Sequence, residues 1–226
     1  MTDPLSPRTS SGRATIVEIV APSIGVAWMD IAKCIMSSGV TSTYDGLRIR
    51  EVVMAALIVT KPDTTDDVIE RLGDRERLSW MHANFTDPRE VPELGDAASY
   101  ATRLYDYAGS GRDQVAWVVS TLRRDPLSRS ATITTFQPLT DTSYIPCVSL
   151  LDFYLVDGDL ELAVYAHSID FGAKGYGNLV ELAWIQSHVA HELHVPVGRL
   201  TMFVKSAHVY DSDDDFMTDA LGKHFG

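Results

Sequence analysis

A predicted β-hairpin in the second half of the chain brings together a thiol, a hydroxyl and a carboxylate. Asp157-Gly158 is the signal of a type I′ turn, and strand-forming residues flank it on both sides. One arm begins at Cys147 and the other ends at Ser168-Ile169-Asp170, so antiparallel pairing places both at the same edge of a sheet. Cys147 could act there as a nucleophile in covalent catalysis. A lone cysteine is more often a small buried hydrophobic residue, and the hairpin by itself leaves that alternative open.

Short motifs follow one another at fixed spacing in this half of the chain. They are Asp125-Pro-Leu-Ser-Arg129, Ile145-Pro-Cys147, His167-Ser-Ile-Asp170, Asn178 and Ser206-Ala-His208-Val-Tyr210. Each motif alone is common, but their order and spacing together are specific. In this order the chain resembles the thymidylate synthase family, which also includes pyrimidine hydroxymethylases.

The resemblance implies an α+β fold of the thymidylate synthase type, in which helices flank a mostly antiparallel sheet and two copies dimerise through that sheet. The 226 residues suffice for one domain with a complete hydrophobic core. We therefore predict a single domain over residues 14–226. Residues 1–13 are rich in Ser, Thr and Pro, which predicts a disordered N-terminal tail.

The composition narrows the classes of partner. The formal net charge of −12 argues against a nucleic-acid polymer or an anionic membrane, but a small anion could still bind where a few arginines face a cleft. Cys34 and Cys147 are the only cysteines, which excludes a disulfide framework and a cysteine-based metal site. No apolar run is long enough to span a membrane and no signal peptide is evident, so we predict a cytoplasmic protein.

The resemblance also implies catalytic roles. Cys147 would add to C6 of a pyrimidine, which lets C5 attack the one-carbon unit of 5,10-methylenetetrahydrofolate. Nearby arginines would lower the pKa of the thiol, and Asp170 would contact the pterin of the folate. Tyr100 falls in Tyr100-Ala-Thr-Arg103, which is similar to a Tyr-Gly-x-Arg segment that lines the family's active site. A buried tyrosine more often only packs and makes one hydrogen bond.

Substrate-binding roles follow from the same resemblance. Asn178 would read the base, because its amide can donate to one edge atom and accept from the next, which fits O4 and N3–H of uracil. Relatives that use cytosine often carry Asp there, so Asn178 favours uracil. His208 and Tyr210 would hold a sugar hydroxyl, and Ser168 belongs to the same substrate site. Arg129 would bind the phosphate from across the dimer interface, unless it is an ordinary surface charge.

Several positions depart from the family's pattern. His167 stands where most relatives have Arg, and Ser130 stands where most have a second Arg, so two phosphate-binding positions are weaker or neutral at pH 7. The family's active-site Glu falls at Ala55, and Glu51, one helical turn earlier, is a candidate replacement. Arg48 and Arg50 could both be solvated charges. Alternatively, one of them could contact a phosphate or the C-terminal tail that closes over the site.

Periodicity and capping residues predict the elements around the site. Ser23 is expected to cap a helix that ends at Gly39, and a long helix is expected to start at Asn178. Helices are also expected at residues 64–81 and 113–124, and strands at 14–20, 44–51, 131–136 and 200–209.

Two further groups of polar residues are predicted to lie on the solvated surface. His188, His191 and His194 recur every three residues and could hold a metal, but few acidic partners accompany them, so we predict no metal site. The acidic run at residues 211–215 is expected to be solvated.

The function implied by the resemblance is methylation of dUMP to dTMP with 5,10-methylenetetrahydrofolate. One alternative is a hydroxymethylase that acts on dUMP, UMP or a cytosine nucleotide. Another is a dimeric nucleotide-binding protein without turnover, which the residue at Ala55 favours and the retained Cys147 disfavours, because binding alone needs no thiol.

Overall fold

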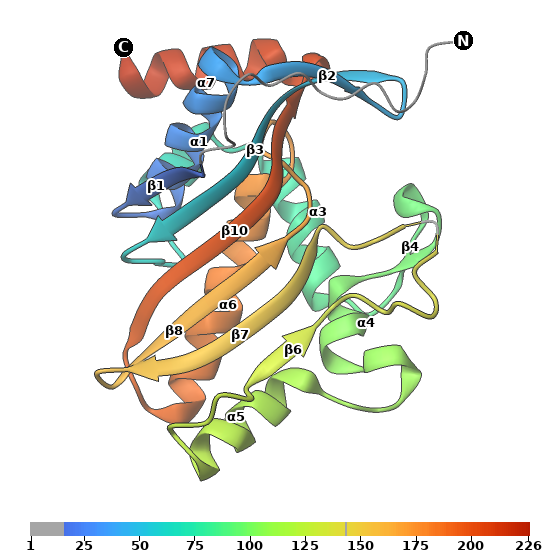
Figure 1. Cartoon of the computed structure of the whole chain (residues 1–226), viewed down its shortest axis with the longest axis vertical. Coiled ribbons are helices and arrows are strands. Elements are labelled where there is room, and N and C mark those ends of the chain that lie inside the picture. Colours follow the sequence, from blue (N-terminus) through green and yellow to red (C-terminus); the bar gives the residue numbers. More distant parts are fainter. Residues whose placement is uncertain (1–15, 143) are drawn as a thin grey trace.

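The computed structural model describes residues 16–142 and 144–226, so the predicted N-terminal tail lies outside the described residues. An eight-stranded sheet forms the centre of the protein (Figure 1). Two short strands lie off its main path, β2 (Val40–Tyr44) beside β3 and β9 (Ile169–Asp170) beside β10. The main path runs in the order β1 (Val17–Ala21), β3 (Leu47–Val59), β10 (Val197–Tyr210), β8 (Asp159–Ala166), β7 (Val148–Val156) and β6 (Thr132–Thr134).

The sheet is mixed. Strand pairs β2–β3, β3–β10, β7–β8 and β6–β7 are antiparallel, whereas β1–β3, β8–β10 and β9–β10 are parallel. The predicted α+β class agrees with this architecture, but the expectation of a mostly antiparallel sheet holds only in part. The parallel pairs occur where a helix lies between the two strands in the chain, because parallel neighbours need such a crossover.

The hairpin predicted at Asp157-Gly158 joins β7 to β8. Both turn residues have positive φ, 54° at Asp157 and 94° at Gly158, as a type I′ turn requires. Val148 pairs with Ala166 across the hairpin, and the backbone N–H of His167 donates to the carbonyl of Cys147 at 3.0 Å. The hairpin therefore brings the predicted nucleophile beside the chain that leads to Asp170.

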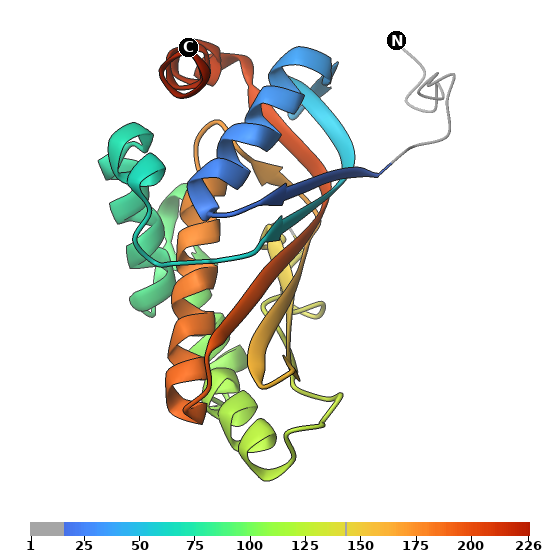
Figure 2. The ribbon, with the colours of Figure 1, turned by 90° about the vertical axis from the view of Figure 1, so that its left-hand side faces the viewer.

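The helices cover one face of the sheet, and the other face carries none of the described helices (Figure 2). Helix α1 (Ile24–Ser38) begins after Ser23, whose hydroxyl accepts a hydrogen bond from Val26 N, as predicted. Helix α6 (Gly175–Leu193) begins before Asn178, so Asn178 lies in its first turn and does not start it. None of the helices in the described part of the chain is long and apolar enough to cross a membrane.

The single helix predicted over residues 64–81 is two helices, α2 (Asp67–Leu72) and α3 (Arg75–Thr86). Asp66 and Asp74 each accept hydrogen bonds from the first N–H groups of the helix that follows. Gly73 ends the first helix. The two capping residues set the boundary between α2 and α3, and the spacing of apolar residues alone does not reveal this boundary.

The remaining elements are shorter or lie at the C-terminal end. They are the hairpin β4 (Glu90–Val91) and β5 (Ala97–Ala98), the helices α4 (Tyr100–Tyr105), α5 (Gln114–Arg124) and α7 (Asp214–Phe225), and the 3-10 turns at Pro92–Leu94, Tyr107–Gly109 and Asp211–Asp213.

The acidic run before α7 is not simply solvated, contrary to the prediction. Asp213 is buried and accepts from Arg77 at 2.6 Å, and Asp214 accepts from Arg50 at 2.5 Å. Arg48 also lies 3.3 Å from Asp211. Of the alternatives predicted for the two β3 arginines, contact with the C-terminal segment is the one observed. These ion pairs attach the C-terminal segment to the sheet and to α3.

Asp66 joins two helices, and this predicts a measurable stability. Its carboxylate accepts from Gly25 N of α1 at 2.8 Å and from Val68 N and Ile69 N of α2. Burial raises the pKa of Asp66, but hydrogen bonds from Ser23 and these N–H groups outweigh it and hold the pKa below its usual value. Asp66→Ala should therefore cost about 2 kcal/mol in urea unfolding at pH 7.

The control for this variant is Asp67→Ala, which removes an exposed acid from the same turn. Because the folded pKa of Asp66 is lowered, its contribution should be present at neutral pH and fade as the pH falls below about 4. Equal stability of the two variants at pH 7 would contradict this role.

Candidate active site

A cavity of about 710 Å³ opens between the sheet and helices α3, α4 and α6. Of the nine side chains predicted to form the site, Arg129 alone is absent from its lining and lies exposed on the surface. The other eight are Tyr100, Cys147, His167, Ser168, Asp170, Asn178, His208 and Tyr210.

Strand register explains why these distant residues meet. Cys147 precedes β7, and His167 and Ser168 follow β8. In β9, Asp170 pairs directly with His208 of β10. Asn178 comes from the first turn of α6, which starts soon after β9. The central strand β10 therefore holds the two halves of the site together.

The Cys147 thiol is unbridged and half-buried. Burial raises the pKa of Cys147 and the Asp170 carboxylate adds to this effect, while Lys174 and a hydrogen bond with Tyr144 oppose it. The expectation that an arginine would lower this pKa is not met, because no arginine lines the cavity in the described ranges. Lys174 is the cation that favours the thiolate here.

Tyr100 holds the backbone next to the thiol. Its hydroxyl accepts a hydrogen bond from Val148 N at 2.9 Å, and its ring stacks on Phe85 with centroids 4.3 Å apart. Burial raises the pKa of this phenol well above its usual value, so Tyr100 keeps its proton and can donate a hydrogen bond to a ligand.

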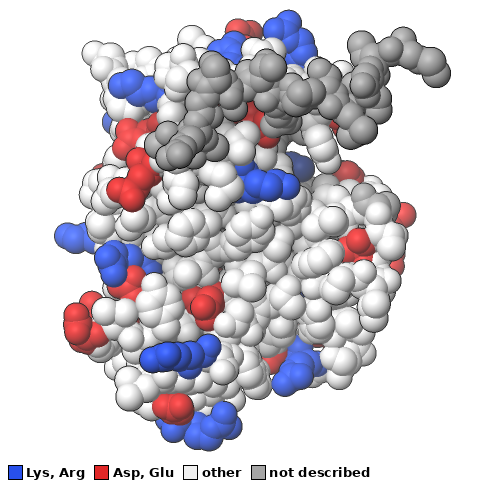
Figure 3. All heavy atoms as spheres, viewed as in Figure 1, with Lys and Arg blue, Asp and Glu red and all other residues white. Residues whose placement is uncertain are grey.

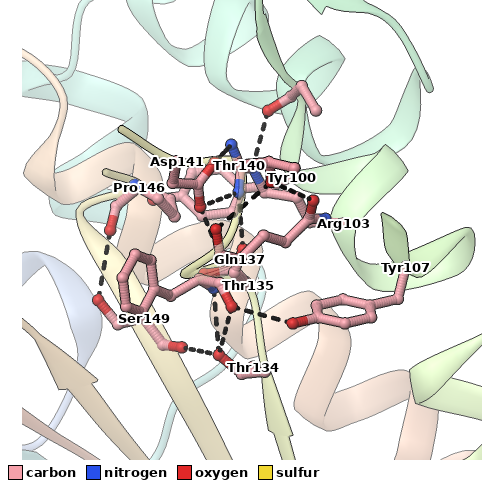
Figure 4. A network of polar contacts seen from close by, with 12 residues as sticks. Tyr100, Arg103, Tyr107, Thr134, Thr135, Gln137, Thr140, Asp141, Pro146 and Ser149 are labelled. Carbon is pink, nitrogen blue, oxygen red and sulfur yellow. Dashed lines mark hydrogen bonds and ion pairs between the residues drawn. The ribbon is translucent and has the colours of Figure 1, made fainter. Parts of the chain in front are cut away.

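A buried ion pair fixes the segment that precedes Cys147 (Figure 4). The Arg103 side chain is 2% exposed, and its guanidinium donates to both carboxylate oxygens of Asp141 at 2.7 and 2.8 Å. It also donates to the carbonyls of Ala98 and Thr135. Gln137 N donates to the same Asp141 carboxylate at 2.7 Å. Arg103, from the segment that sequence analysis assigned to the site, thus acts behind the cavity wall and does not line the cavity.

Asp170 is a carboxyl group that changes charge near neutral pH. Burial and the nearby Asp213 raise its pKa to about 6, although the N–H groups of Gly172 and Ala173 donate to it at 3.0 and 3.2 Å. A carboxyl group in this range can either donate or accept a hydrogen bond near pH 6.

Two buried polar atoms in the lining have no partner in the described part of the chain. Asn178 donates through Nδ2 to the carbonyl of Lys174 at 3.1 Å, but its Oδ1 accepts nothing. His208 is 6% exposed, and its Nδ1 is also unpaired while its ring packs edge-on against Tyr210. Because unpaired buried polar atoms are costly, both atoms are suited to bind a ligand that enters the cavity.

Glu51 and Ala55 lie in different places relative to the cavity. Glu51 lines the cavity, accepts from Ser206 Oγ at 2.6 Å and pairs with His208 in the β3–β10 register. Ala55 is buried in the core and is absent from the lining. Spacing by a helical turn does not apply, because both residues belong to strand β3. Glu51, the candidate replacement, therefore lies at the cavity, and Ala55 does not.

Trp80, Lys174 and Lys205 are among the lining residues that were not identified from the sequence. Trp80 comes from α3, and the ammonium of Lys174 lies 4.4 Å from the centre of its ring. Lys205 comes from β10. Lys174 could have been found, since it lies one helical turn before Asn178, and Lys205 adjoins the Ser206-Ala-His208 motif. No sequence signal separates Trp80 from a core residue.

His188, His191 and His194 lie toward the far end of α6 from the cavity. The ring centroids of His191 and His194 are 6.5 Å apart. Within residues 16–142 and 144–226, no group of three or more His, Cys, Asp or Glu side chains could hold a metal ion.

The ion pair behind the thiol should be important for stability. Asp141→Ala would leave the Arg103 guanidinium buried without its partner, so we expect a loss of about 3–5 kcal/mol in unfolding free energy. Asp87→Ala breaks the exposed, 3.9 Å contact with Arg89 and should cost less than about 1 kcal/mol. Urea unfolding of both variants tests this difference, and similar losses would refute it.

Asp170→Asn should change how stability depends on pH. The folded pKa of about 6 exceeds the usual value of about 4, so the folded wild type holds an extra proton between these limits and loses stability as the pH rises through them. The variant cannot lose that proton. Its stability relative to wild type should therefore increase by on the order of 3 kcal/mol from pH 4 to pH 7.5. A difference that does not change with pH would contradict the raised pKa.

Comparison with known proteins agrees with this arrangement. The family model described as thymidylate synthase matches residues 47–224. The "Putative thymidylate synthase" of Methanosarcina barkeri is 30% identical over 204 residues, which cover 89% of this chain and 93% of the relative. A protein of the same description from Methanothermobacter thermautotrophicus is 36% identical over 201 residues, covering 83% and 90%. "Thymidylate synthase 1/2" of Encephalitozoon cuniculi is 28% identical over 176 residues, covering 71% and 60%. The chain belongs to the thymidylate synthase family.

Proposed function

We propose that this protein transfers a one-carbon unit to C5 of a pyrimidine nucleotide, and that the reaction is the methylation of dUMP to dTMP. The observation that carries the proposal is the meeting of Cys147 with the unpaired buried atoms of Asn178 and His208 in one cavity. A thiol beside unsatisfied polar groups suits a polar ring that is bound in place and attacked covalently.

Cys147 is the nucleophile in the proposed mechanism. Its thiolate forms a bond to C6, and the electron pair of the C5–C6 double bond moves to C5, with negative charge shared by O4. C5 would then bond to the one-carbon unit that the folate supplies, and the bond between that carbon and the folate nitrogen would break. C5 would lose its proton, and the S–C6 bond would break to release the thiolate. Lys174 favours the thiolate at the start and at the end of this cycle, because it is the cation that opposes the rise in the thiol pKa caused by burial.

Neutral groups would orient the nucleotide. Asn178 Oδ1 is free to accept from N3–H of uracil. His208 and Tyr210 would hold a sugar hydroxyl, and Tyr100 can donate a hydrogen bond beside the thiol. The low local dielectric of a buried site makes each of these contacts stronger than it would be in water.

The lining of the cavity supports a folate as the proposed second ligand. Trp80 and Ile145 offer apolar wall beside the thiol, and Asp170 offers a carboxyl group whose pKa is about 6. When bound, 5,10-methylenetetrahydrofolate would supply the one-carbon unit and the hydride that reduces it to methyl. Asp170 would hold the pterin through hydrogen bonds, and Trp80 would shield the reacting carbon from water.

We also propose a homodimer formed through the uncovered face of the sheet. Exposed apolar side chains of three adjacent strands lie in register there, because Phe203 pairs with Tyr165 and Tyr165 with Leu150. They are 44%, 41% and 37% exposed. Figure 3 shows that few charged residues lie over the middle of this face. A contiguous apolar surface of this kind is typical of a protein interface. Arg129 is exposed and would be donated to the partner's phosphate site.

Cys147→Ser tests the proposed chemistry. The wild type, incubated with dUMP and 5,10-methylenetetrahydrofolate, should yield dTMP and dihydrofolate by mass spectrometry. The variant should lose roughly a thousandfold or more of kcat, because a serine hydroxyl is a far weaker nucleophile at neutral pH. Its Kd for dUMP should stay close to that of the wild type.

Cys34→Ser is the matched control, since Cys34 is the other half-buried free thiol and lies in α1, outside the cavity. It should retain activity. A hydroxymethylated product with release of tetrahydrofolate would establish the alternative reaction. Parallel incubations with UMP, dCMP or CMP in place of dUMP would identify which base and sugar the protein accepts. Full activity in Cys147→Ser would rule out the mechanism.

A further inference from the structure

Lys205 of β10 and His167, the residue that follows β8, lie side by side at the cavity. In the parallel β8–β10 pair, Val204 is the direct partner of Ala166, and the next residue on each strand lines the cavity. Lys205 also lies two residues beyond Phe203 on β10, and both are exposed. Since alternate residues of a strand share a face, Lys205 reaches this part of the cavity from the uncovered side of the sheet.

The charge of Lys205 is not neutralised by a contact within the described ranges, where it has no ion-pair partner. The two carboxylates of the lining are engaged elsewhere. Glu51 accepts from Ser206, and Asp170 accepts from two backbone N–H groups after β9. An ammonium group that faces a cavity without a counter-ion is suited to bind an anion there.

His167 adds hydrogen bonds to this end of the cavity without adding charge at neutral pH. Burial and the nearby Lys205 both lower its pKa, so the imidazole is neutral. Its Nδ1 lies 3.5 Å from the Ser149 hydroxyl. Ser168, the next residue, lines the cavity with a further hydroxyl.

The second lysine of the cavity lies elsewhere. Lys174 precedes α6, stacks on Trp80 and influences the thiol of Cys147, so its charge serves the reacting end. Lys205, in contrast, lies near His167, whose pKa its charge lowers. The positive charge of the cavity is therefore divided between two places.

We propose that Lys205 binds the phosphate of the nucleotide and supplies the positive charge that the chain lacks at position 167. His167 and Ser168 contribute neutral hydrogen bonds to the same phosphate. The inference rests on the proposed function only in taking the anion to be a nucleoside monophosphate. A single ammonium is a point charge on a flexible stem, so it needs no fixed bidentate geometry to hold the phosphate.

The test measures binding without folate, so that it does not depend on turnover. Calorimetric Kd values are obtained for dUMP and for deoxyuridine with the wild type, Lys205→Met, Lys205→Arg and Lys61→Met. Lys61 is the matched control, because it is exposed, also lacks an ion-pair partner in the described ranges, and lies outside the cavity lining.

Lys205→Met should weaken dUMP binding by roughly tenfold or more, the usual effect of losing a hydrogen bond to a charged group, and leave deoxyuridine binding unchanged. Lys205→Arg should restore most of the dUMP affinity, and Lys61→Met should match the wild type. Equal dUMP affinity in Lys205→Met and Lys61→Met would overturn the inference, as would an equal loss for dUMP and deoxyuridine.

These outcomes are separable from failure of the proposed function. A wild type that binds dUMP through Lys205 but forms no product with folate would refute the one-carbon transfer and keep the phosphate site. Turnover of dUMP that is indifferent to Lys205→Met would keep the transfer and refute the phosphate site.

Discussion

The pairing of β10 with β8 and β9 on one side and with β3 on the other is the constraint on which the site depends. Through this one strand, Asp170 is placed opposite His208, His208 opposite Glu51, and Lys205 beside His167. Because side chains alternate along a strand, a slip of one residue would turn every one of these groups to the opposite face. Backbone pairing, more than any contact between the site's own side chains, determines the cavity's composition.

A second layer of interactions keeps the thiol in place. The segment before Cys147 is tied to α4 by Arg103 and Asp141, and the residue after it is tied to the same helix by the Tyr100 hydroxyl. A buried ion pair contributes little net stability but strongly penalises loss of either partner. Its value here is that the thiol is held from both sides by one short helix, which suits a nucleophile that must attack a bound ring from a fixed direction.

The sequence was sufficient to predict the features that depend on local signals. The turn at Asp157-Gly158, the cap at Ser23 and the spacing of motifs from Cys147 to Tyr210 all correspond to observed structure or to the lining of one cavity. Features that depend on neighbours distant in the chain could not be predicted. The acidic run before α7 pairs with arginines of β3 and α3, so its solvation depends on tertiary contacts.

The acidic position and the lysines illustrate the same limit. Glu51 was considered only as a replacement for Ala55, because a count along the chain does not show which residues of strand β3 reach the cavity. Lys174 and Lys205 carry the positive charge that motif matching sought in arginines. Lys205 follows a residue of β10 that pairs with Ala166, just before the His167 motif, and a linear motif cannot detect a charge placed on a neighbouring strand.

Trapping the covalent adduct tests the central claim most directly. A fluorine at C5 cannot leave as a proton, so 5-fluoro-dUMP with 5,10-methylenetetrahydrofolate should halt the cycle while the S–C6 bond is intact. Intact-mass spectrometry should then show the protein heavier by one nucleotide and one folate, with peptide mapping placing the addition on Cys147. An unmodified mass under conditions where the nucleotide binds, or an adduct at any other residue, would contradict the account.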